Sequence, residues 1–189
     1  MFSVIFPGQG SQIVGMGKEF YDKFDLVKNL FKQADEALDL PLSKIILEGP
    51  KEELDLTTNT QPAIFLISYS IFQVIIKEFN IDLHKAKFFA GHSLGEYSAI
   101  ACAGYLDFQD TVKILKIRGE AMQNSVPKGE GGMIAVLGIS IKDIEKILED
   151  NKNTFSAEIA NDNSEGQIVI SGKNKNLDKL ISVLKEESI

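Results

Sequence analysis

Apolar residues along the chain occur both in short continuous runs and in stretches with helical spacing. Residues 2–6 are a β-branched and aromatic run that ends at Pro7-Gly8, which predicts a buried strand followed by a loop. From Met16 to about Leu38, apolar residues recur every three or four positions between charged ones, which predicts one or two surface helices. Pro41 and Pro50 then separate short helical pieces.

The most apolar stretch is residues 63–76. Polar side chains interrupt it and it is too short to cross a membrane, so we expect a buried helix that ends near Phe79, with Pro62 in its first turn. Residues 87–90 predict a second strand and residues 96–103 a helix directly after it. Asp107 is a suitable cap for a further helix to about Asn124. This alternation predicts an α/β fold with a parallel sheet.

A glycine-rich polar stretch at residues 127–132 predicts a boundary between a unit of residues 1–127 and a unit of residues 128–189. In the second unit the pattern predicts a strand, a helix, two strands and a helix, at residues 133–137, 141–149, 155–159, 167–171 and 177–184. This order is the βαββα part of a ferredoxin-like βαββαβ unit, without its last strand. We therefore expect an α/β chain whose small subdomain is incomplete at the C-terminus.

Charge and cysteine content exclude several function classes. The net charge of −7 and the pI near 4.9 disfavour nucleic acid and membrane surfaces, because both attract a basic face. The single cysteine, Cys102, cannot form an intramolecular disulfide, and no Cys/His cluster is suited to zinc. It lies in an apolar run, which favours a buried thiol. With no secretory signal at the N-terminus, we expect a cytoplasmic protein without a metal.

The first candidate for chemistry is the loop of small residues after the first strand, residues 8–13. Ile13 stands where the dinucleotide-binding fingerprint needs a glycine, and Glu19 stands where a phosphate loop that includes Gly17-Lys18 needs serine or threonine. The loop lies at the carboxyl end of a strand, where open parallel sheets bind ligands. A ligand loop and a simple strand-to-helix turn both fit this segment.

The second candidate is Gly91-His92-Ser93-Leu94-Gly95, a Gly-x-Ser-x-Gly sequence between a predicted strand and a predicted helix. This is the pattern of a nucleophile elbow, in which the serine projects above the sheet and the amide of the next residue, Leu94, faces a developing oxyanion. A serine hydroxyl needs a base, and the chain has only two histidines. His92 adjoins Ser93 and His84 precedes the strand, so we expect the base to come from beyond Ile189 or from another chain.

Arginine is rare in this chain: all but one of its 20 basic side chains are lysines, and the exception is Arg118. A lone arginine among lysines suggests a position where the planar guanidinium binds a carboxylate through two bonds. An ordinary surface residue on the helix that follows Asp107 is the alternative.

Three segments together resemble the malonyl-CoA:acyl carrier protein transacylases of bacterial fatty acid synthesis, and the resemblance spans the chain. They are Phe6-Pro7-Gly8-Gln9-Gly10-Ser11-Gln12, Gly91-His92-Ser93-Leu94-Gly95-Glu96-Tyr97-Ser98-Ala99 and Arg118-Gly119-Glu120-Ala121-Met122-Gln123. Residues 55–62, which include Thr60-Gln61-Pro62, and residues 163–172 are similar to this family as well. Glu165 departs from it, because a proline is common there, and the chain ends before the family's catalytic histidine and last strands.

This resemblance implies an α/β-hydrolase-like large subdomain in which Ser93 accepts the acyl group. The amides of Gln9 and Leu94 would form the oxyanion hole, and Arg118 would pair with the malonyl carboxylate. His92 would line the pocket. By the same resemblance, Asn161 and Asn163 of the small subdomain would face the cleft.

The function that we expect is transfer of malonyl from malonyl-CoA to the phosphopantetheine thiol of acyl carrier protein through a malonyl-Ser93 ester. The coenzyme A thioester is then a substrate, and no metal or bound cofactor is needed. One alternative is an esterase or thioesterase, which shares the elbow but gives no reason for Arg118. A truncated remnant that binds coenzyme A esters without turnover is the other.

Overall fold

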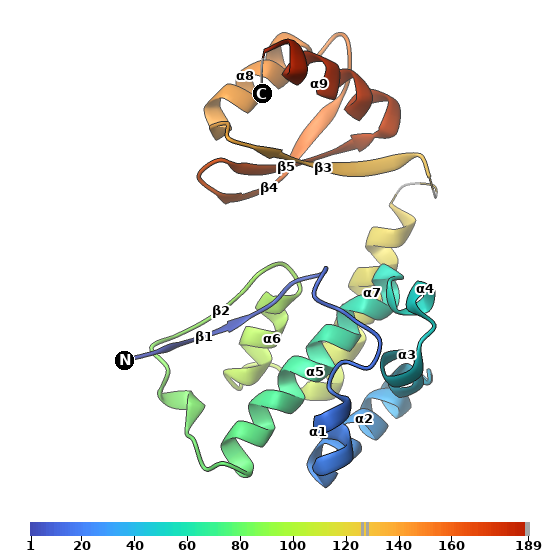
Figure 1. Ribbon diagram of the computed structural model, residues 1–189, viewed down its shortest axis with the longest axis vertical. Helices are drawn as coiled ribbons and strands as arrows, with labels where there is room; N and C mark the ends of the chain where they lie inside the picture. Colours follow the sequence, from blue (N-terminus) through green and yellow to red (C-terminus); the bar gives the residue numbers. More distant parts are fainter. Residues whose placement is uncertain (126, 128, 188–189) are drawn as a thin grey trace. The chain divides into compact units, whose positions relative to one another are not determined.

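The computed structural model describes residues 1–125, 127 and 129–187. The chain folds as two compact units, Met1–Asn124 and Ser125–Ile189 (Figure 1). The boundary predicted between residues 127 and 128 involves Lys128, which lies outside the described residues.

The first unit is a two-stranded parallel sheet with helices around it. Its elements are β1 (Ser3–Phe6), α1 (Lys18–Lys23), α2 (Asp25–Leu38), α3 (Leu42–Glu48), α4 (Lys51–Leu54), α5 (Thr57–Lys77), the 3-10 helix η1 (Leu83–Lys85), β2 (Phe88–Gly91), α6 (Gly95–Cys102) and α7 (Phe108–Asn124). The strands pair in register from Ser3 with Phe88 to Phe6 with Gly91, so their carboxyl ends lie side by side. The predicted α/β fold with a parallel sheet is confirmed.

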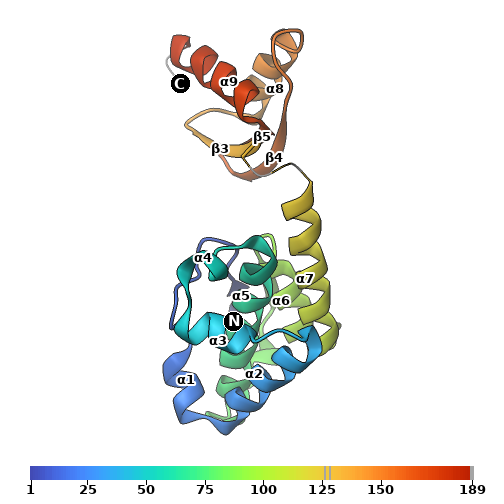
Figure 2. The same ribbon diagram turned by 90° about the vertical axis from the view of Figure 1, so that its right-hand side faces the viewer.

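The core of this unit lies around α5, which packs against α2, α6 and α7. In Figure 2, α6 and α7 lie on one side of α5, and α1, α3 and α4 lie on the other. Phe31, Phe65 and Leu115 are fully buried members of this core and come from α2, α5 and α7. Asp107 caps α7 as predicted, because its Oδ1 accepts bonds from the amides of Gln109 at 2.8 Å and Asp110 at 3.3 Å.

One prediction about α5 is wrong. The helix begins at Thr57, so Pro62 is its sixth residue rather than a residue of the first turn. The polar side chains of Asn59 and Thr60 extend the helix backwards, because they donate hydrogen bonds to the carbonyls of Glu53 and Leu54 at 2.9 and 2.5 Å. At 21 residues, α5 is also long and apolar enough to cross a membrane by length and composition, although 61% of its apolar window is buried in the protein.

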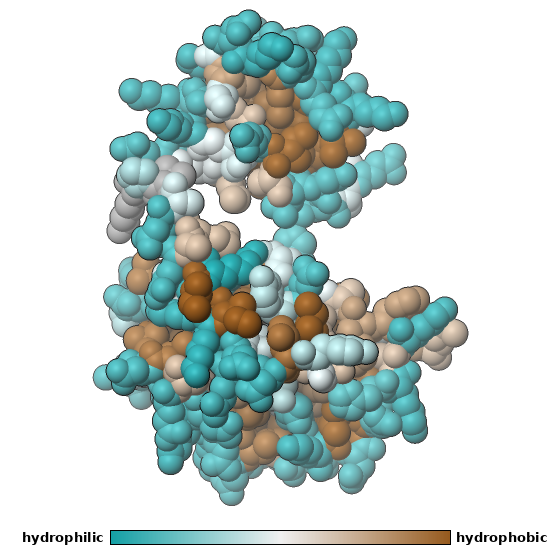
Figure 3. Space-filling view, turned by 180° about the vertical axis from the view of Figure 1, so that it is seen from behind, coloured by the Kyte–Doolittle hydropathy of each residue, from teal (hydrophilic) through white to brown (hydrophobic). Residues whose placement is uncertain are grey.

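An apolar groove of about 370 Å³ separates β1 from α5. Val4, Ile5 and Phe6 line one wall, and Ile64, Ile71 and other α5 residues line the opposite wall. The space-filling view shows apolar areas among hydrophilic side chains on the surface of each unit (Figure 3). Ile5, with 77% of its surface exposed, is the most exposed large apolar residue of β1 and β2.

The second unit is a three-stranded antiparallel sheet packed against two helices. Its elements are β3 (Gly131–Leu137), α8 (Ile141–Asp150), β4 (Ala157–Ser164), β5 (Gln167–Lys173) and α9 (Asn174–Glu186), and its strand order is β3-β5-β4. Ile144 of α8, Ile170 of β5 and Leu180 of α9 are fully buried in its core. The observed order has the chain connectivity βαββα.

Several boundaries in this unit differ from the pattern, most clearly those of β4 and α9. β4 starts at Ala157 and continues to Ser164, beyond the predicted end at Ile159. Register shifts after Ile159 and Asp162 allow a polar, exposed segment to remain paired with β5. Alternation of apolar residues cannot show such a strand. α9 begins at Asn174, three residues before its first buried residue, Leu177.

Candidate active site

The Gly-x-Ser-x-Gly segment forms a tight turn between β2 and α6. Ser93 has a φ of 54°, in the left-handed region that costs a non-glycine residue energy. A Cβ at Gly91 would collide with the backbone of Gly95, and a Cβ at Gly95 would lie 2.6 Å from the carbonyl oxygen of Phe6. Both glycines therefore allow the closest packing of β1, β2 and α6, and that packing holds the serine in its strained conformation.

The amide of Leu94 takes no part in the hydrogen bonds within this turn. The N–H groups of Gly95 and Glu96 donate to the carbonyls of His92 and Ser93, at 2.9 and 3.1 Å. Within the described part of the chain, the N–H of Leu94 has no acceptor, as is usual at a helix N-terminus. Its side chain is fully buried, which fixes the residue. The positive end of the α6 dipole thus lies beside the Ser93 hydroxyl.

The loop that carries Gln9 leaves the carboxyl end of β1, next to this turn. The amide of His92 donates to the Phe6 carbonyl at 3.2 Å, and a Cβ at Gly8 would lie 2.7 Å from His92 Nδ1. The His92 ring therefore packs against the Gly8 backbone. Gln9 is exposed, and its Nε2 donates to Thr57 Oγ1 at 3.3 Å. The structure thus brings the loop of Gln9 beside the turn of Ser93.

Arg118 reaches Ser93 from α7. Its Nη2 donates to Ser93 Oγ at 3.1 Å and its Nη1 donates to Gln61 Oε1 at 2.6 Å. The guanidinium carbon lies 5.8 Å from the centre of the Tyr97 ring. All of these partners are neutral, and no carboxylate of the described residues lies within 4.0 Å of Arg118. A half-buried positive charge without a counter-ion is suited to an anionic ligand.

Gln61 is a site residue for which sequence reasoning gave no role. It is fully buried on α5, and its Nε2 donates to Met122 Sδ at 3.2 Å while its Oε1 accepts from Arg118. Gly119 allows this approach, because a Cβ there would lie 2.7 Å from the carbonyl oxygen of Thr57. The only signal in the sequence was Thr60-Gln61-Pro62, a segment shared with the family.

Of the other candidate residues, His84 lies away from Ser93, and Asn161 and Asn163 belong to the second unit. His84 lies on η1, at the amino end of β2, whereas Ser93 follows its carboxyl end. His84 is exposed, and its ring contacts Phe72, with centroids 5.5 Å apart. Asn161 and Asn163 are exposed residues of β4 in the second unit, where Asn163 Nδ2 donates to Gln167 Oε1 at 3.4 Å.

The environment of Cys102 is unlike that of a reactive thiol. Cys102 is buried at the end of α6, and burial raises the pKa of its thiol to about 12. Its thiolate is therefore scarce at neutral pH. Among the described residues, no three His, Cys, Asp or Glu side chains are grouped to hold a metal ion.

Residues 3–189 match the acyl transferase domain family, so the chain belongs to this family. It is 42% identical over 188 residues to the malonyl CoA-acyl carrier protein transacylase of Haemophilus influenzae. This match covers 98% of the chain and 59% of that relative. It is 44% identical over 183 residues to the transacylase of the same name from Bacillus subtilis, covering 96% of this chain and 56% of that protein.

Solved structures show the same likeness. The acyl-carrier-protein-S-malonyltransferase of Bartonella henselae superposes with a TM-score of 0.91 at 43% identity, covering 99% of this chain and 60% of that one. A malonyl-transacylase solved in complex with a type II polyketide acyl-carrier protein superposes with a TM-score of 0.87 at 35% identity, covering 98% of this chain and 59% of that one. The chain thus spans less than two thirds of the length of these relatives.

Proposed function

We propose that this chain carries the malonyl-accepting site of a malonyl-CoA:acyl carrier protein transacylase. One observation supports this proposal most: Arg118 places an uncompensated positive charge 3.1 Å from Ser93 Oγ. A substrate whose acyl group ends in a carboxylate can bind this guanidinium while its thioester lies at the serine. An esterase for uncharged substrates would gain nothing from that charge. The names of the relatives agree with a malonyl substrate.

In the proposed reaction, Ser93 Oγ attacks the thioester carbonyl of malonyl-CoA. The amides of Gln9 and Leu94 stabilise the oxyanion, the carbon–sulfur bond breaks, and coenzyme A leaves as a thiol with the serine proton. The phosphopantetheine thiol of acyl carrier protein then attacks the malonyl-Ser93 ester and releases the serine. Both steps need a general base. His84 is at the wrong end of β2 for this role, and a base from outside these residues remains a prediction.

The proposal extends to the surroundings of the site. Coenzyme A thioester is a substrate, and the two transfers need neither a metal nor a bound cofactor. His92, packed on Gly8, would line the acyl pocket, and the roles of Asn161 and Asn163 stay predictions of the family resemblance. Acyl carrier protein is the acceptor and the cytoplasm the compartment. A solved relative in complex with an acyl-carrier protein supports the choice of acceptor.

The test is formation of the covalent intermediate. The chain is incubated with malonyl-CoA and its intact mass is followed over time, with Ser93→Ala as the control. Because the general base is expected outside these residues, we expect one malonyl increment to accumulate only slowly on the wild type, located on Ser93 by peptide mapping, and none on the variant. Binding of malonyl-CoA without an adduct would instead support a non-catalytic remnant. Faster hydrolysis of an uncharged ester than acylation by malonyl would support an esterase.

A further inference from the structure

Within the described chain, residues 8–12 of the loop between β1 and α1 form no backbone–backbone hydrogen bonds, whereas Gly15 farther along donates to the Ile46 carbonyl at 2.7 Å. Gly10, Gly15 and Gly17 all have positive φ angles, and a Cβ at Gly10 would meet nothing within 4 Å. Such a loop is free to move unless side chains hold it. The proposed mechanism nevertheless needs one of its amides, that of Gln9, at a fixed position.

Two hydrogen bonds hold the peptide groups on either side of Gln9. The carbonyl of Gly8, in the same peptide group as the Gln9 amide, accepts from Ser11 Oγ at 3.0 Å. The amide of Gly10, in the next peptide group, donates to Gln12 Oε1 at 2.8 Å. Because a peptide group is planar, a bond to one of its ends sets the direction of the other. Ser11 and Gln12 together therefore orient the Gln9 amide.

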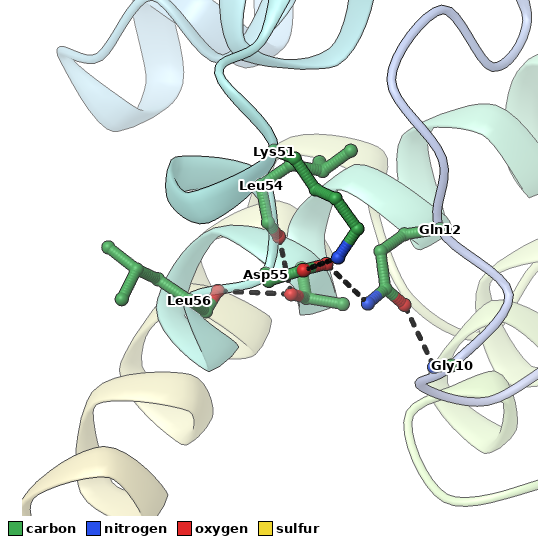
Figure 4. Close-up of polar contacts among 7 residues, drawn as sticks. Gly10, Gln12, Lys51, Leu54, Asp55 and Leu56 are labelled. Atoms are coloured by element: carbon green, nitrogen blue, oxygen red, sulfur yellow. Dashed lines mark hydrogen bonds and ion pairs between the residues drawn. The ribbon is translucent and has the colours of Figure 1, made fainter. Parts of the chain in front are cut away.

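Gln12 is in turn held by Asp55, at the corner between α4 and α5 (Figure 4). Gln12 Nε2 donates to Asp55 Oδ1 at 2.9 Å, and Asp55 also forms an ion pair with Lys51. The hydrogen bond from Gln12 is the main reason that the pKa of Asp55 is lowered, and Lys51 contributes further. The corner itself is fixed, because Thr60 Oγ1 donates to the carbonyls of Leu54 and Leu56 at 2.5 and 3.1 Å.

The carboxylate decides which way the Gln12 amide faces. An ionised aspartate only accepts hydrogen bonds, so the NH₂ group of Gln12 must face Asp55 and its oxygen must face Gly10. With a neutral partner at position 55, either orientation of the Gln12 amide finds a bond, and the reversed one presents an NH₂ group to the Gly10 N–H. Asp55 thus controls the loop through Gln12, although the two residues are 43 positions apart in the sequence.

We propose that Asp55 is a positioning residue: through Gln12 it orients the amide of Gln9 for oxyanion stabilisation. The role rests on the proposed function, because it assumes that Ser93 is acylated. We call the two hydrogen bonds that lead from Asp55 through Gln12 to Gly10 the bridge. An oxyanion forms during the transfer of either acyl group, so loss of the bridge slows malonyl and acetyl transfer to Ser93 by the same factor. Loss of the Arg118 contact changes their ratio instead.

The experiment exchanges the charges across the bridge. Gln12→Glu places two carboxylates against each other, and Asp55→Asn removes the charge that orients Gln12. The double variant restores a carboxylate–amide pair, in which the carboxylate at position 12 accepts from both the side-chain amide at position 55 and the N–H of Gly10. Gln109→Glu, an exposed position on α7, is the matched control for added charge. For each protein, the rates of malonyl and acetyl adduct formation on Ser93 and the amide exchange of residues 8–12 are measured.

We expect Gln12→Glu to slow both adducts by roughly tenfold, less than the roughly 100- to 1,000-fold loss on removing an oxyanion donor outright. The double variant recovers to within about threefold of the wild type, since the two sites are coupled. A double variant as slow as Gln12→Glu, an unchanged rate in Gln12→Glu, or a changed malonyl-to-acetyl ratio would overturn the proposal.

A wild type that forms no adduct would contradict the proposed function itself. Amide exchange of residues 8–12 then tests the role of Asp55 separately. Exchange that rises in Gln12→Glu and recovers in the double variant would show that the hydrogen bonds from Asp55 through Gln12 to Gly10 hold the loop, and exchange that does not respond would refute this role.

Discussion

Two neighbouring turns, which leave the paired strands β1 and β2, are held in different ways. The turn after β2 is fixed by backbone contact, because Gly91, Gly95 and the Phe6 carbonyl pack with no room for a side chain. The loop after β1 has open space at Gly10 and depends on hydrogen bonds between side chains and backbone. Ser93, the proposed nucleophile, is thus held by steric packing, whereas the loop of Gln9, whose amide is a proposed oxyanion donor, is held by hydrogen bonds that lead through Gln12 to Asp55.

This difference implies different responses to substitution. Steric packing fails abruptly, because an added methyl group has no space and the neighbouring backbone must move. A hydrogen-bonded bridge fails gradually, because each bond contributes only about 1 kcal/mol and water can replace a lost partner. Changes in the turn after β2 should therefore have larger effects than changes in the loop after β1.

The largest effect is expected from Gly91→Ala. Its Cβ would overlap the Gly95 backbone, so either α6 moves away from the sheet or the first unit unfolds. We expect acylation of Ser93 to become undetectable, together with a clear fall in the unfolding temperature in differential scanning calorimetry. Gly104→Ala is the control, because Gly104 has a positive φ but open space, so it costs only about 1 kcal/mol of strain. Equal losses in the two variants would contradict the steric argument.

A large and selective effect is expected from Arg118→Ala. Removing the partner of a bound carboxylate costs about 2 to 5 kcal/mol, so malonyl transfer to Ser93 should fall at least roughly thirtyfold. Acetyl transfer should change much less, since acetyl has no carboxylate. The measurement is the ratio of the two adduct rates from mass spectrometry. If malonyl and acetyl transfer fall by the same factor, Arg118 does not select the acid.

A smaller change is expected from Gln61→Glu, which keeps the shape of the side chain and adds a negative charge beside Arg118. The new carboxylate would pair with the guanidinium and compete with malonyl, so the apparent KM for malonyl-CoA should rise by roughly tenfold. Gln61→Met, which is similar in length but uncharged, separates competition from loss of the hydrogen bond. A KM that rises equally in both variants would show that the charge is not the cause.

The smallest effect concerns the stability contributed by Asp55. Because Gln12 and Lys51 lower the pKa of Asp55 in the folded state, its contribution is present above the unfolded pKa of about 3.9 and is lost as the pH falls through the lower folded value. Asp55→Asn should therefore lower the unfolding temperature slightly at pH 7, and the difference from wild type should shrink as the pH falls below about 3.9 and vanish once Asp55 is protonated in the folded state. A difference that persists at pH 2 would indicate a packing effect. Lys28 also lowers the pKa of Asp25, but this pair is present in both proteins and so does not contribute to the difference.

The tight turn after β2 could be predicted from the sequence, because glycines in a fixed pattern between a strand and a helix indicate a turn formed by neighbouring residues. The turn at Ser93 and the cap at Asp107 both follow from residues that are adjacent in the chain. The bridge from Asp55 could not be predicted, since Gln12 and Asp55 meet only when the helices pack. Gln61 was missed for a similar reason. It contacts Arg118 only after α5 and α7 have packed together, and the two residues are 57 positions apart in the sequence.

Element boundaries were missed where polar side chains extend an element. The start of α5 depends on Asn59 and Thr60 bonding to the preceding corner, and the end of β4 depends on bulges in a polar segment. Neither leaves a trace in hydrophobic periodicity. The role of Leu94 followed from the elbow pattern, and the roles of Gln9, His92, Asn161 and Asn163 came from the family resemblance. All of them remain predictions.

The spread of the site along the chain has a consequence during synthesis on the ribosome. Gln9 emerges early, whereas Arg118, whose helix completes the packing around α5, emerges much later. At about 5 to 20 residues per second, the interval is roughly 5 to 20 s. Throughout that time the apolar wall of α5 has only part of its neighbours, so the nascent chain should be a client of ribosome-associated chaperones until α7 has been made.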